Sequence, residues 1–388
     1  MGRHKFLSKS QLLGSLVACC IGSSTAMAGD VIVEIAGNNI VCTGSTQGDV
    51  VEISEGDNGN LIIDGDDSTT FNGQASLDTG IDLSFVNNIT MDMRGGDDSV
   101  TIDFSADNPG PEGISGDLSL RLGPGGDDVS LQLGDVGGNV EIVMNGGDDF
   151  LLFRSSTIAG DVTYLSGAGS DVAFFGRALF GAEPVDVVGN LTTRCAGGDD
   201  ETRYLEGTVF GELNHSDGGG SDEMIMENYT VLNGMVYQGG GGSDFADFGG
   251  DSDFGGFGGP GGEDDIFANT AALIVDSLDN TVIEGGLTAR NGGGNDVFNF
   301  GVSGGAVCAG EFDYAGGRGR DTVNAGDFAS FQGAISVSMG QGNDTVNYSF
   351  SVQFSFPGLI NGGAGIDSIQ PSAFELQFLG FVVIGFEQ

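Results

Sequence analysis

Residues 145–171 read NGGDDFLLFRSSTIAGDVTYLSGAGSD, and this stretch decides the fold. A glycine-rich turn ends in Asp149 and is followed by an apolar segment, a turn at Gly160–Asp161, a second apolar segment and a further glycine-rich turn that ends in Asp171. Both segments are rich in apolar and β-branched residues with a period of two, which is typical of strands bounded by turns. One unit of 22 residues, from Asp149 to Asp171, therefore contains two short strands.

The same glycine-rich turn recurs along most of the chain. Its copies end at Asp98, Asp128, Asp149, Asp171, Asp200, Asp222, Asp244, Asp265, Asp296, Asp321, Asp344 and Asp367, with a weaker copy at Asp67. The final aspartates are mostly 21–25 residues apart, and a period in this range is typical of solenoids. Such units bury their apolar side chains only when they stack. The sequence therefore predicts an all-β fold, a right-handed parallel β-helix of about 13 coils, stacked at about 4.8 Å.

The predicted strands share the layout of this unit. They lie at Val129–Leu133, Phe150–Phe153, Gly116–Leu122, Gly138–Met144, Gly160–Leu165 and Gly189–Thr193, with single apolar contacts at Val136, Ile158 and Val188. Four longer copies insert residues near Thr69–Gly80, Asp107–Gly113, Gly176–Asp186 and Asn269–Asn280, and we expect these loops on a similar side. Phe245–Gly262 is nearly all Gly, Phe, Asp and Ser, and we expect a loosely ordered coil there.

The N-terminus has the features of an export signal. A short basic segment precedes the apolar stretch Leu12–Ile21, and Ala26-x-Ala28 is a small-residue cleavage site. We expect residues 1–28 to be a signal peptide, 29–66 N-terminal cap strands, 67–370 the solenoid repeats and 371–388 a C-terminal cap. The alternative is a lipoprotein anchored through Cys19, because the residues before it resemble a lipobox.

Charge excludes several classes of function. The chain has 56 acidic and 12 basic residues and a net charge of −44, and the part after residue 28 contains no lysine. Such a chain is repelled by nucleic acid and by anionic membranes. Without lysine it has no Schiff-base nucleophile and no P-loop, and with His215 as its one histidine it has no histidine cluster. No segment after the signal is long and apolar enough to span a bilayer.

Stacking would bring the final aspartates of the turns into one row. Carboxylates about 5 Å apart repel each other by about 0.8 kcal/mol in water and about 3 kcal/mol at an effective dielectric constant of 20. Nine arginines after residue 28 cannot neutralise 56 acids, so cations are required. Carboxylate and carbonyl oxygens in flexible glycine-rich turns favour Ca²⁺, and the twelve aspartates from Asp98 to Asp367 are the candidate ligands. The alternative is that Gly-Asp turns are simply stable turns, because Asp bonds to its own backbone.

The turns resemble the nonapeptides of RTX (hemolysin-type calcium-binding) proteins, with the pattern GGxGxDxUx, where U is apolar. Gly316–Asn324 and Gly362–Gln370 match it in full, and Asn291–Asn299 and Met339–Asn347 miss only the first glycine. The resemblance implies that Asp321, Asp367, Asp296 and Asp344 ligate calcium. The RTX repeat recurs every nine residues, whereas here one turn occurs per 22 or so, which leaves one calcium edge at most.

These observations favour an exported, calcium-binding β-solenoid with a structural, surface, matrix or adhesive role. Its expected partners are calcium ions and a cell-surface or extracellular polysaccharide or protein, and its expected location is outside a bacterial cell or on its surface. The alternative is a polysaccharide lyase or hydrolase with a groove under the insertion loops. No catalytic residue is identified, since the arginines are scattered and His215-Ser216-Asp217 is interpreted as a turn edge. Cys42, Cys195 and Cys308 are expected to be small buried hydrophobes.

Overall fold

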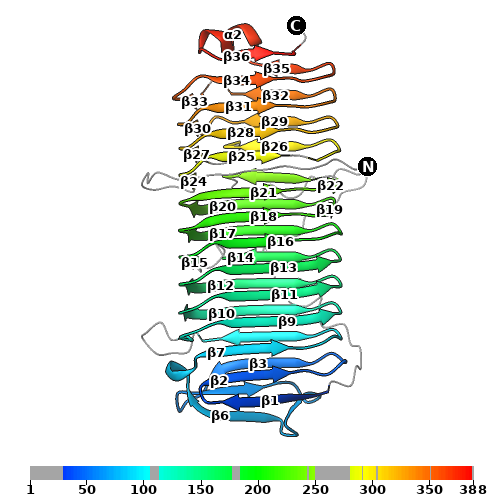
Figure 1. Cartoon of the computed structure of the whole chain (residues 1–388), viewed down its shortest axis with the longest axis vertical. Coiled ribbons are helices and arrows are strands. Elements are labelled where there is room, and N and C mark those ends of the chain that lie inside the picture. The colour runs from blue at the N-terminus through cyan, green and yellow to red at the C-terminus, as the bar shows by residue number, and fades with distance from the viewer. Residues whose placement is uncertain are drawn as a thin grey trace, which may run out of the picture.

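The computed structural model describes residues 29–104, 113–176, 184–242, 244–249, 280–290, 292–302, 305–349 and 351–386. The described residues form a rod in which successive coils stack along the long axis, from the N-terminal strands at one end to the C-terminal strands and a helix at the other (Figure 1). The predicted all-β parallel solenoid is confirmed, because nearly all the coils pair with their neighbours as parallel strands in register.

One coil shows how the sequence makes this shape. Strand β11 (Val140–Gly146) leads into a glycine-rich turn, and β12 (Phe150–Ile158) follows with a bend in its middle. A second turn then leads to β13 (Val162–Ala168), which pairs with β11. Ser155 sits at the bend with a φ of 47°, a left-handed conformation that redirects the chain between the two halves of β12.

The first sheet has 15 strands and runs the length of the rod. In spatial order it comprises β5 (Thr70–Phe71), β1 (Asp30–Ala36), β2 (Asn39–Thr43), β7 (Asn88–Asp92), β9 (Leu118–Pro124), β11, β13, β16 (Leu191–Arg194), β18 (Glu212–Ser216), β21 (Gly234–Gln238), β25 (Leu287–Arg290), β28 (Phe312–Ala315), β31 (Ile335–Ser338), β34 (Gly358–Asn361) and β36 (Val382–Ile384). Apart from β1 and β5, the thirteen strands from β2 to β36 pair in parallel, one for each coil.

The second sheet has two arms on either side of the bend. Its strands are β3 (Val50–Glu55), β4 (Asn60–Asp64), β6 (Ser76–Asp82), β8 (Ser99–Asp103), β10 (Asp128–Val136), β12, β14 (Val172–Phe175), β15 (Val185–Val187), β17 (Glu201–Val209), β20 (Glu223–Val231), β23 (Phe245–Phe248), β24 (Asn280–Ile283), β26 (Val297–Phe300), β27 (Gly305–Cys308), β29 (Thr322–Ala325), β30 (Ala329–Phe331), β32 (Thr345–Tyr348), β33 (Gln353–Phe354) and β35 (Ser368–Gln370). In the middle of the rod β10, β12, β17 and β20 each span both arms as one continuous strand, and β12 pairs with both β14 and β15.

The ends of the rod depart from this pattern. At the N-terminal end β1 is antiparallel to β2, and β4 is antiparallel to both β3 and β6. A short 3-10 helix, η1 (Leu83–Phe85), returns the chain to the stack. At the C-terminal end helix α2 (Ala373–Phe378) precedes β36, with Ser372 and Glu375 forming a capping box. Among the helices of the described residues, none combines the length and hydrophobicity that crossing a bilayer would need.

The core is a continuous column inside the coils. Every second residue of a strand points inward, as in the buried Leu151 and Phe153 of β12. Aromatic rings stack from coil to coil: the centroids of Phe175 and Tyr204 are 5.3 Å apart, and those of Phe300 and Phe331 are 4.8 Å apart. Repetition of inward positions therefore turns small coils into one hydrophobic core.

Glycine in the turns is required by the close approach of neighbouring coils. Gly198 has a φ of 133°, and a Cβ placed there would lie 1.9 Å from the carbonyl oxygen of Gly169 in the preceding coil. Its neighbour Gly197 has ordinary backbone geometry, and a Cβ there would be 3.4 Å from the nearest atom. The turns thus need glycine at particular positions because backbone stacks on backbone.

Three of the inserted segments begin and end at the same place in their coils, between the two arms of the second sheet. Segments 105–112, 177–183 and 250–279 lie outside the described residues, and each falls between the two arms of the second sheet. This placement of the flanking residues agrees with insertion on a similar side for three of the four predicted loops. The prediction is wrong for the fourth, near Thr69–Gly80, which forms β5 and most of β6 at the N-terminal end. Part of the segment expected to be loosely ordered is β23, whose residues pair with β20 and β26. Val188 was predicted to be an inward contact, but it is 52% exposed, and the buried residue is Val187.

Candidate metal centre

A row of buried aspartates runs along the rod, at the turn that precedes the first arm of the second sheet. Its members, here called the rungs of the Asp ladder, are Asp49, Asp98, Asp127, Asp149, Asp171, Asp200, Asp222, Asp244, Asp296, Asp321, Asp344 and Asp367. None is more than 3% exposed. Each rung lies two residues before the first inward residue of its arm, which is apolar in every coil except that of Asp200, where it is Thr202, and this spacing turns the Asp side chain into the coil. The carboxylates therefore lie within the coil wall and not on the outer surface.

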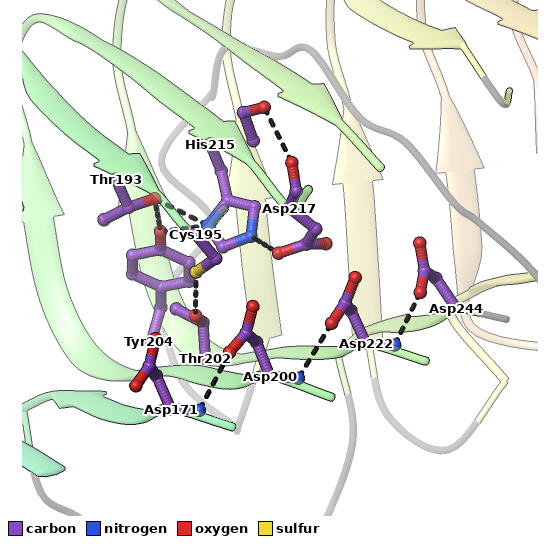
Figure 2. Close-up of polar contacts among 11 residues, drawn as sticks. Asp171, Thr193, Cys195, Asp200, Thr202, Tyr204, His215, Asp217, Asp222 and Asp244 are labelled. Carbon is purple, nitrogen blue, oxygen red and sulfur yellow. Dashed lines mark hydrogen bonds and ion pairs between the residues drawn. The ribbon is translucent and has the colours of Figure 1, made fainter. Parts of the chain in front are cut away.

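Each carboxylate holds the coil before it. The backbone N–H of Asp49 donates to Oδ1 of Asp98 at 2.7 Å, and that of Asp344 donates to Oδ1 of Asp367 at 2.9 Å. The same bond joins successive rungs from Asp49 to Asp244 and from Asp296 to Asp367. Figure 2 shows the run from Asp171 to Asp244. From Asp98 to Asp244 and from Asp321 to Asp367, one oxygen of each carboxylate thus has a fixed structural partner.

The other carboxylate oxygen is buried without a partner in most rungs. Oδ2 has no hydrogen-bond partner among the described residues in Asp98, Asp127, Asp149, Asp171, Asp200, Asp244, Asp344 and Asp367. A buried oxygen anion without a donor is costly, and native proteins rarely leave such groups unsatisfied. A row of oxygens of this kind fits a hard cation such as Ca²⁺, which takes oxygen ligands in flexible geometry.

The alternative to a cation is a proton. Burial raises the pKa of Asp98, Asp127 and Asp149 to about 7, above the usual 3.8, because removal from water disfavours the charged form. Burial likewise raises the pKa of Asp200 to about 8 and that of Asp344 to about 6. The neighbouring carboxylates add to this effect, for example Asp171 and Asp222 beside Asp200. The ladder therefore gains protons or cations readily near neutral pH.

The residue just before each rung follows a different rule. Asp97 accepts the N–H of Gly126 at 3.2 Å, and Asp148 accepts the N–H of Ser170 at 2.9 Å. The series continues through Asp199, which accepts from Ser221 at 2.8 Å. From Asp97 to Ser221 this outer row alternates an acidic with an uncharged residue, so that carboxylates do not face each other in adjacent coils. Nearer the C-terminus the same position holds Asn295, Arg320 and Asn343.

The turn before the first sheet shows the same alternation. Asn88, Asp117, Asn139, Asp161 and Asn190 occupy equivalent positions, and the N–H of each residue donates to Oδ1 of the one before at 2.7–2.9 Å. The side-chain amides of the two later asparagines also donate to the preceding aspartates. In this second row asparagine amides donate hydrogen bonds to the carboxylates and separate them, whereas the buried ladder contains aspartate alone.

The structure brings ten of the twelve predicted aspartates into one ladder: Asp98, Asp149, Asp171, Asp200, Asp222, Asp244, Asp296, Asp321, Asp344 and Asp367. The prediction is wrong for Asp128, which begins β10 outside the ladder, because its neighbour Asp127 is the rung. Asp265 lies outside the described residues. The rungs on either side of it in the sequence, Asp244 and Asp296, belong to directly paired coils.

Two features of the ladder were missed by the sequence reasoning. Asp49 is a rung although no GGxD turn precedes it, and Asp67, the weak copy, is exposed on a turn. The position two residues before an inward apolar residue identifies Asp49 through Val51 and Asp127 through Val129. His215 is also misplaced, because it was interpreted as part of a turn edge and is 1% exposed in the core.

Comparisons with protein families, with curated proteins and with solved structures find no match to this chain. The fold and the ladder therefore stand on the geometry described above. That geometry is a β-solenoid whose coils are joined by a stacked row of buried aspartates, an arrangement compatible with stabilisation by cations.

Proposed function

We propose that this chain is an exported calcium-binding β-solenoid with a structural role at or outside the cell surface. The observation that supports it is the row of buried Oδ2 atoms without hydrogen-bond donors in the ladder. With no lysine after residue 28, the chain supplies few positive charges of its own. Each divalent cation would neutralise two rungs.

The motif resemblance supports calcium in particular. Gly316–Asn324 and Gly362–Gln370 carry the full RTX pattern, and their aspartates, Asp321 and Asp367, are rungs of the ladder. Calcium is scarce in the cytosol and abundant outside cells, which agrees with the export signal in residues 1–28. Ion binding would then be part of folding, since ligands far apart in the sequence meet only in the stacked coils.

A structural role also fits the distribution of polar groups. The ladder lies inside the coil wall, where its carboxylates bind the backbone of neighbouring coils and are not open to a large substrate. We propose that bound calcium stiffens the rod, and that its outer faces contact a cell-surface or extracellular polysaccharide or protein. Catalysis is not part of this proposal.

Calcium titration of the purified chain at pH 8 in chelator-treated buffer tests the proposal. We expect a cooperative gain of β signal by far-ultraviolet circular dichroism, and a higher Tm, with Ca²⁺ and much less with Mg²⁺. A rod that is fully folded in chelator and unchanged by Ca²⁺ would contradict it.

A pair of variants links the response to the ladder. Asp171→Asn keeps an oxygen acceptor for the N–H of Asp149 but removes one buried charge. We expect it to reduce the calcium-dependent rise in Tm and to raise the Tm in chelator. Asp148→Asn changes an exposed carboxylate on the outer row and serves as the matched control. Equal effects of both variants would mean that calcium acts on the general surface charge.

A further inference from the structure

A second column of side chains runs beside the ladder, five residues before each rung. In three successive coils its members are Met93, Leu122 and Met144, which are buried and apolar. In the next three coils the same inward position holds Ser166, Cys195 and Asp217, and strand pairing places these in register. The column thus changes from apolar to metal-ligating chemistry in the middle of the rod.

His215 lies on β18 next to the polar part of this column. Its Nε2 is 2.6 Å from Oδ1 of Asp217, and its Nδ1 is 2.6 Å from Oγ1 of Thr193 and 2.8 Å from the hydroxyl of Tyr204. The two hydroxyl groups at Nδ1 hold the ring in one orientation, with Nε2 facing Asp217, as in metal sites where neighbouring groups position the ligand.

Potential ligand atoms converge at this point. Cys195, His215 and Asp217 each offer one ligand atom, and the three atoms lie within 4.8 Å of one another. Asp217 forms a second such group with the rungs Asp222 and Asp244. Figure 2 shows Cys195, His215 and Asp217 near one another, beside the row formed by Asp200, Asp222 and Asp244. All six are at most 6% exposed.

We propose that Cys195, His215 and Asp217 bind a Zn²⁺ ion inside the rod, at a site separate from the calcium ladder. Thiolate and imidazole ligands select a borderline metal such as zinc, whereas calcium prefers oxygen alone. The charges of the ion and its ligands cancel, because Zn²⁺ is matched by one thiolate and one carboxylate, and the third ligand is a neutral imidazole. Formation of the site releases the thiol proton of Cys195, since a coordinated thiol is deprotonated.

Asp217 also brings the site next to the ladder, because it forms the second group with Asp222 and Asp244. Oδ2 of Asp244 is buried and has no hydrogen-bond partner among the described residues, and a carboxylate oxygen of this rung lies near one of Asp217. Through Cys195 and Asp217, which follow β16 and β18, the ion would join two successive coils beside the ladder.

Burial dictates how the ion enters. Because the ligands are almost fully shielded from solvent, we expect zinc to bind while the coils assemble and to exchange slowly afterwards. The site is independent of the ladder proposal: a thiolate-metal signal reports on Cys195, whereas calcium titration reports on the carboxylates.

The test is refolding of the full chain with Ca²⁺ present and Co²⁺ as the probe metal. We expect one equivalent of cobalt per chain and a thiolate-to-cobalt charge-transfer absorption that excess Zn²⁺ abolishes when it is present during refolding. Cys195→Ser should lose this absorption, and Cys308→Ser, which changes a buried cysteine elsewhere in the core, should keep it. Absence of the absorption in the unmodified chain, or its survival in Cys195→Ser, would overturn the zinc site.

Asp217→Asn covers the case in which the cysteine variant fails to fold. The amide preserves the size of the side chain and its contact with His215, so circular dichroism should show a folded rod. We expect its affinity for cobalt to fall by about tenfold or more, which is the scale of losing one ligand or its orientation. Unchanged affinity in a folded Asp217→Asn chain would also overturn the proposal.

Discussion

The backbone N–H of Asp149 donates to Oδ1 of Asp171, 22 residues later, at 2.9 Å. This bond joins two coils through a side chain that is 1% exposed, and the other oxygen of the same carboxylate has no hydrogen-bond partner among the described residues. Each such carboxylate therefore joins two coils through one oxygen and leaves the other oxygen buried without a donor or counter-charge in the part of the chain that the structure describes. Neighbouring coils cannot stack without bringing their carboxylates together.

The exposed rows show that uncharged neighbours are available in this sequence. Asn139 lies between Asp117 and Asp161, and Ser170 lies between Asp148 and Asp199. Repulsion is avoided where water would already screen it, whereas the buried ladder repeats aspartate in every coil. This contrast argues that the buried carboxylates are kept for a charge that asparagine cannot bind.

Stability without cations should fall as pH rises. Because burial raises the pKa of Asp98, Asp127 and Asp149 from 3.8 to about 7, the folded rod holds more protons than the unfolded chain between these values. The contribution is complete below about pH 4 and is lost as pH approaches 8, where Asp200 also ionises. Even about 1 kcal/mol for each of five rungs corresponds to a fall in Tm of about 7 °C for a chain of this length.

Differential scanning calorimetry in chelator between pH 4 and pH 8 measures this fall. The experiment is run in about 1 M NaCl, because salt screens the exposed carboxylates and leaves buried ones largely unaffected. Saturating Ca²⁺ should restore the Tm at pH 8 and have little effect at pH 4. A Tm that rises with pH in chelator would show that the rungs are ionised in the metal-free rod without penalty.

The assignment of the rung in the PGGDD turn can be tested with two neighbouring residues. Asp127→Ala removes the acceptor of the Asp98 N–H in a buried site and should cost about 1–3 kcal/mol. Asp128→Ala changes a half-buried side chain outside the ladder and should stay within about 0.5 kcal/mol. Urea unfolding at pH 5 in chelator compares the two without a contribution from metal. The reverse order would return the rung to Asp128.

Much of the fold is predictable from the sequence because each coil repeats the same local rules. The strands around Phe150–Phe153 and Val129–Leu133 follow from alternation, and the stack follows from the period of the turns. What the turns alone do not specify is the register of an individual residue. Strand pairing aligns Pro124 with Gly146 and not with Asn145, so Gly126 takes the place of the outer Asp148 and Asp127 takes the place of the rung Asp149.

The polar cluster of Thr193, Cys195, His215 and Asp217 could not be predicted from the sequence for a different reason. His215 and Asp217 are adjacent enough in sequence to suggest a turn, but Thr193 and Cys195 come from the coil before. Only the exact pairing of β16 with β18 places these four side chains together. Once the rungs are assigned, the sequence itself shows the cluster, because the position five residues before the rung changes from apolar residues to Cys195 and Asp217.

The turn glycines give a third prediction. Gly198→Ala should cost about 2–4 kcal/mol or prevent folding, because its Cβ would meet the carbonyl oxygen of Gly169 at 1.9 Å and its φ is 133°. Gly197→Ala, one residue earlier, meets nothing closer than 3.4 Å and should be nearly neutral. Thermal unfolding of the two variants separates close backbone stacking from general turn flexibility. Similar losses at both positions would show that the coils do not approach as closely as described.

The last prediction concerns the alternating row at the exposed turn. Asn139→Asp would place three carboxylates in successive coils, at positions 117, 139 and 161, and would remove the amide that donates to Asp117. Each new pair of charges about 5 Å apart repels by about 0.8 kcal/mol in water, so we expect a loss of about 1–2 kcal/mol at low salt. The loss should shrink in about 1 M NaCl, where the Debye length is about 3 Å.

Asp161→Asn is the matched control, because it removes a charge from the same row and keeps the oxygen that accepts the Asn190 N–H. It should be neutral or slightly stabilising at low salt. Denaturant unfolding of both variants at two salt concentrations decides the matter. If Asn139→Asp is tolerated at low salt, alternation in the exposed row has no electrostatic purpose, and the contrast with the all-aspartate ladder loses its force as an argument for a bound cation.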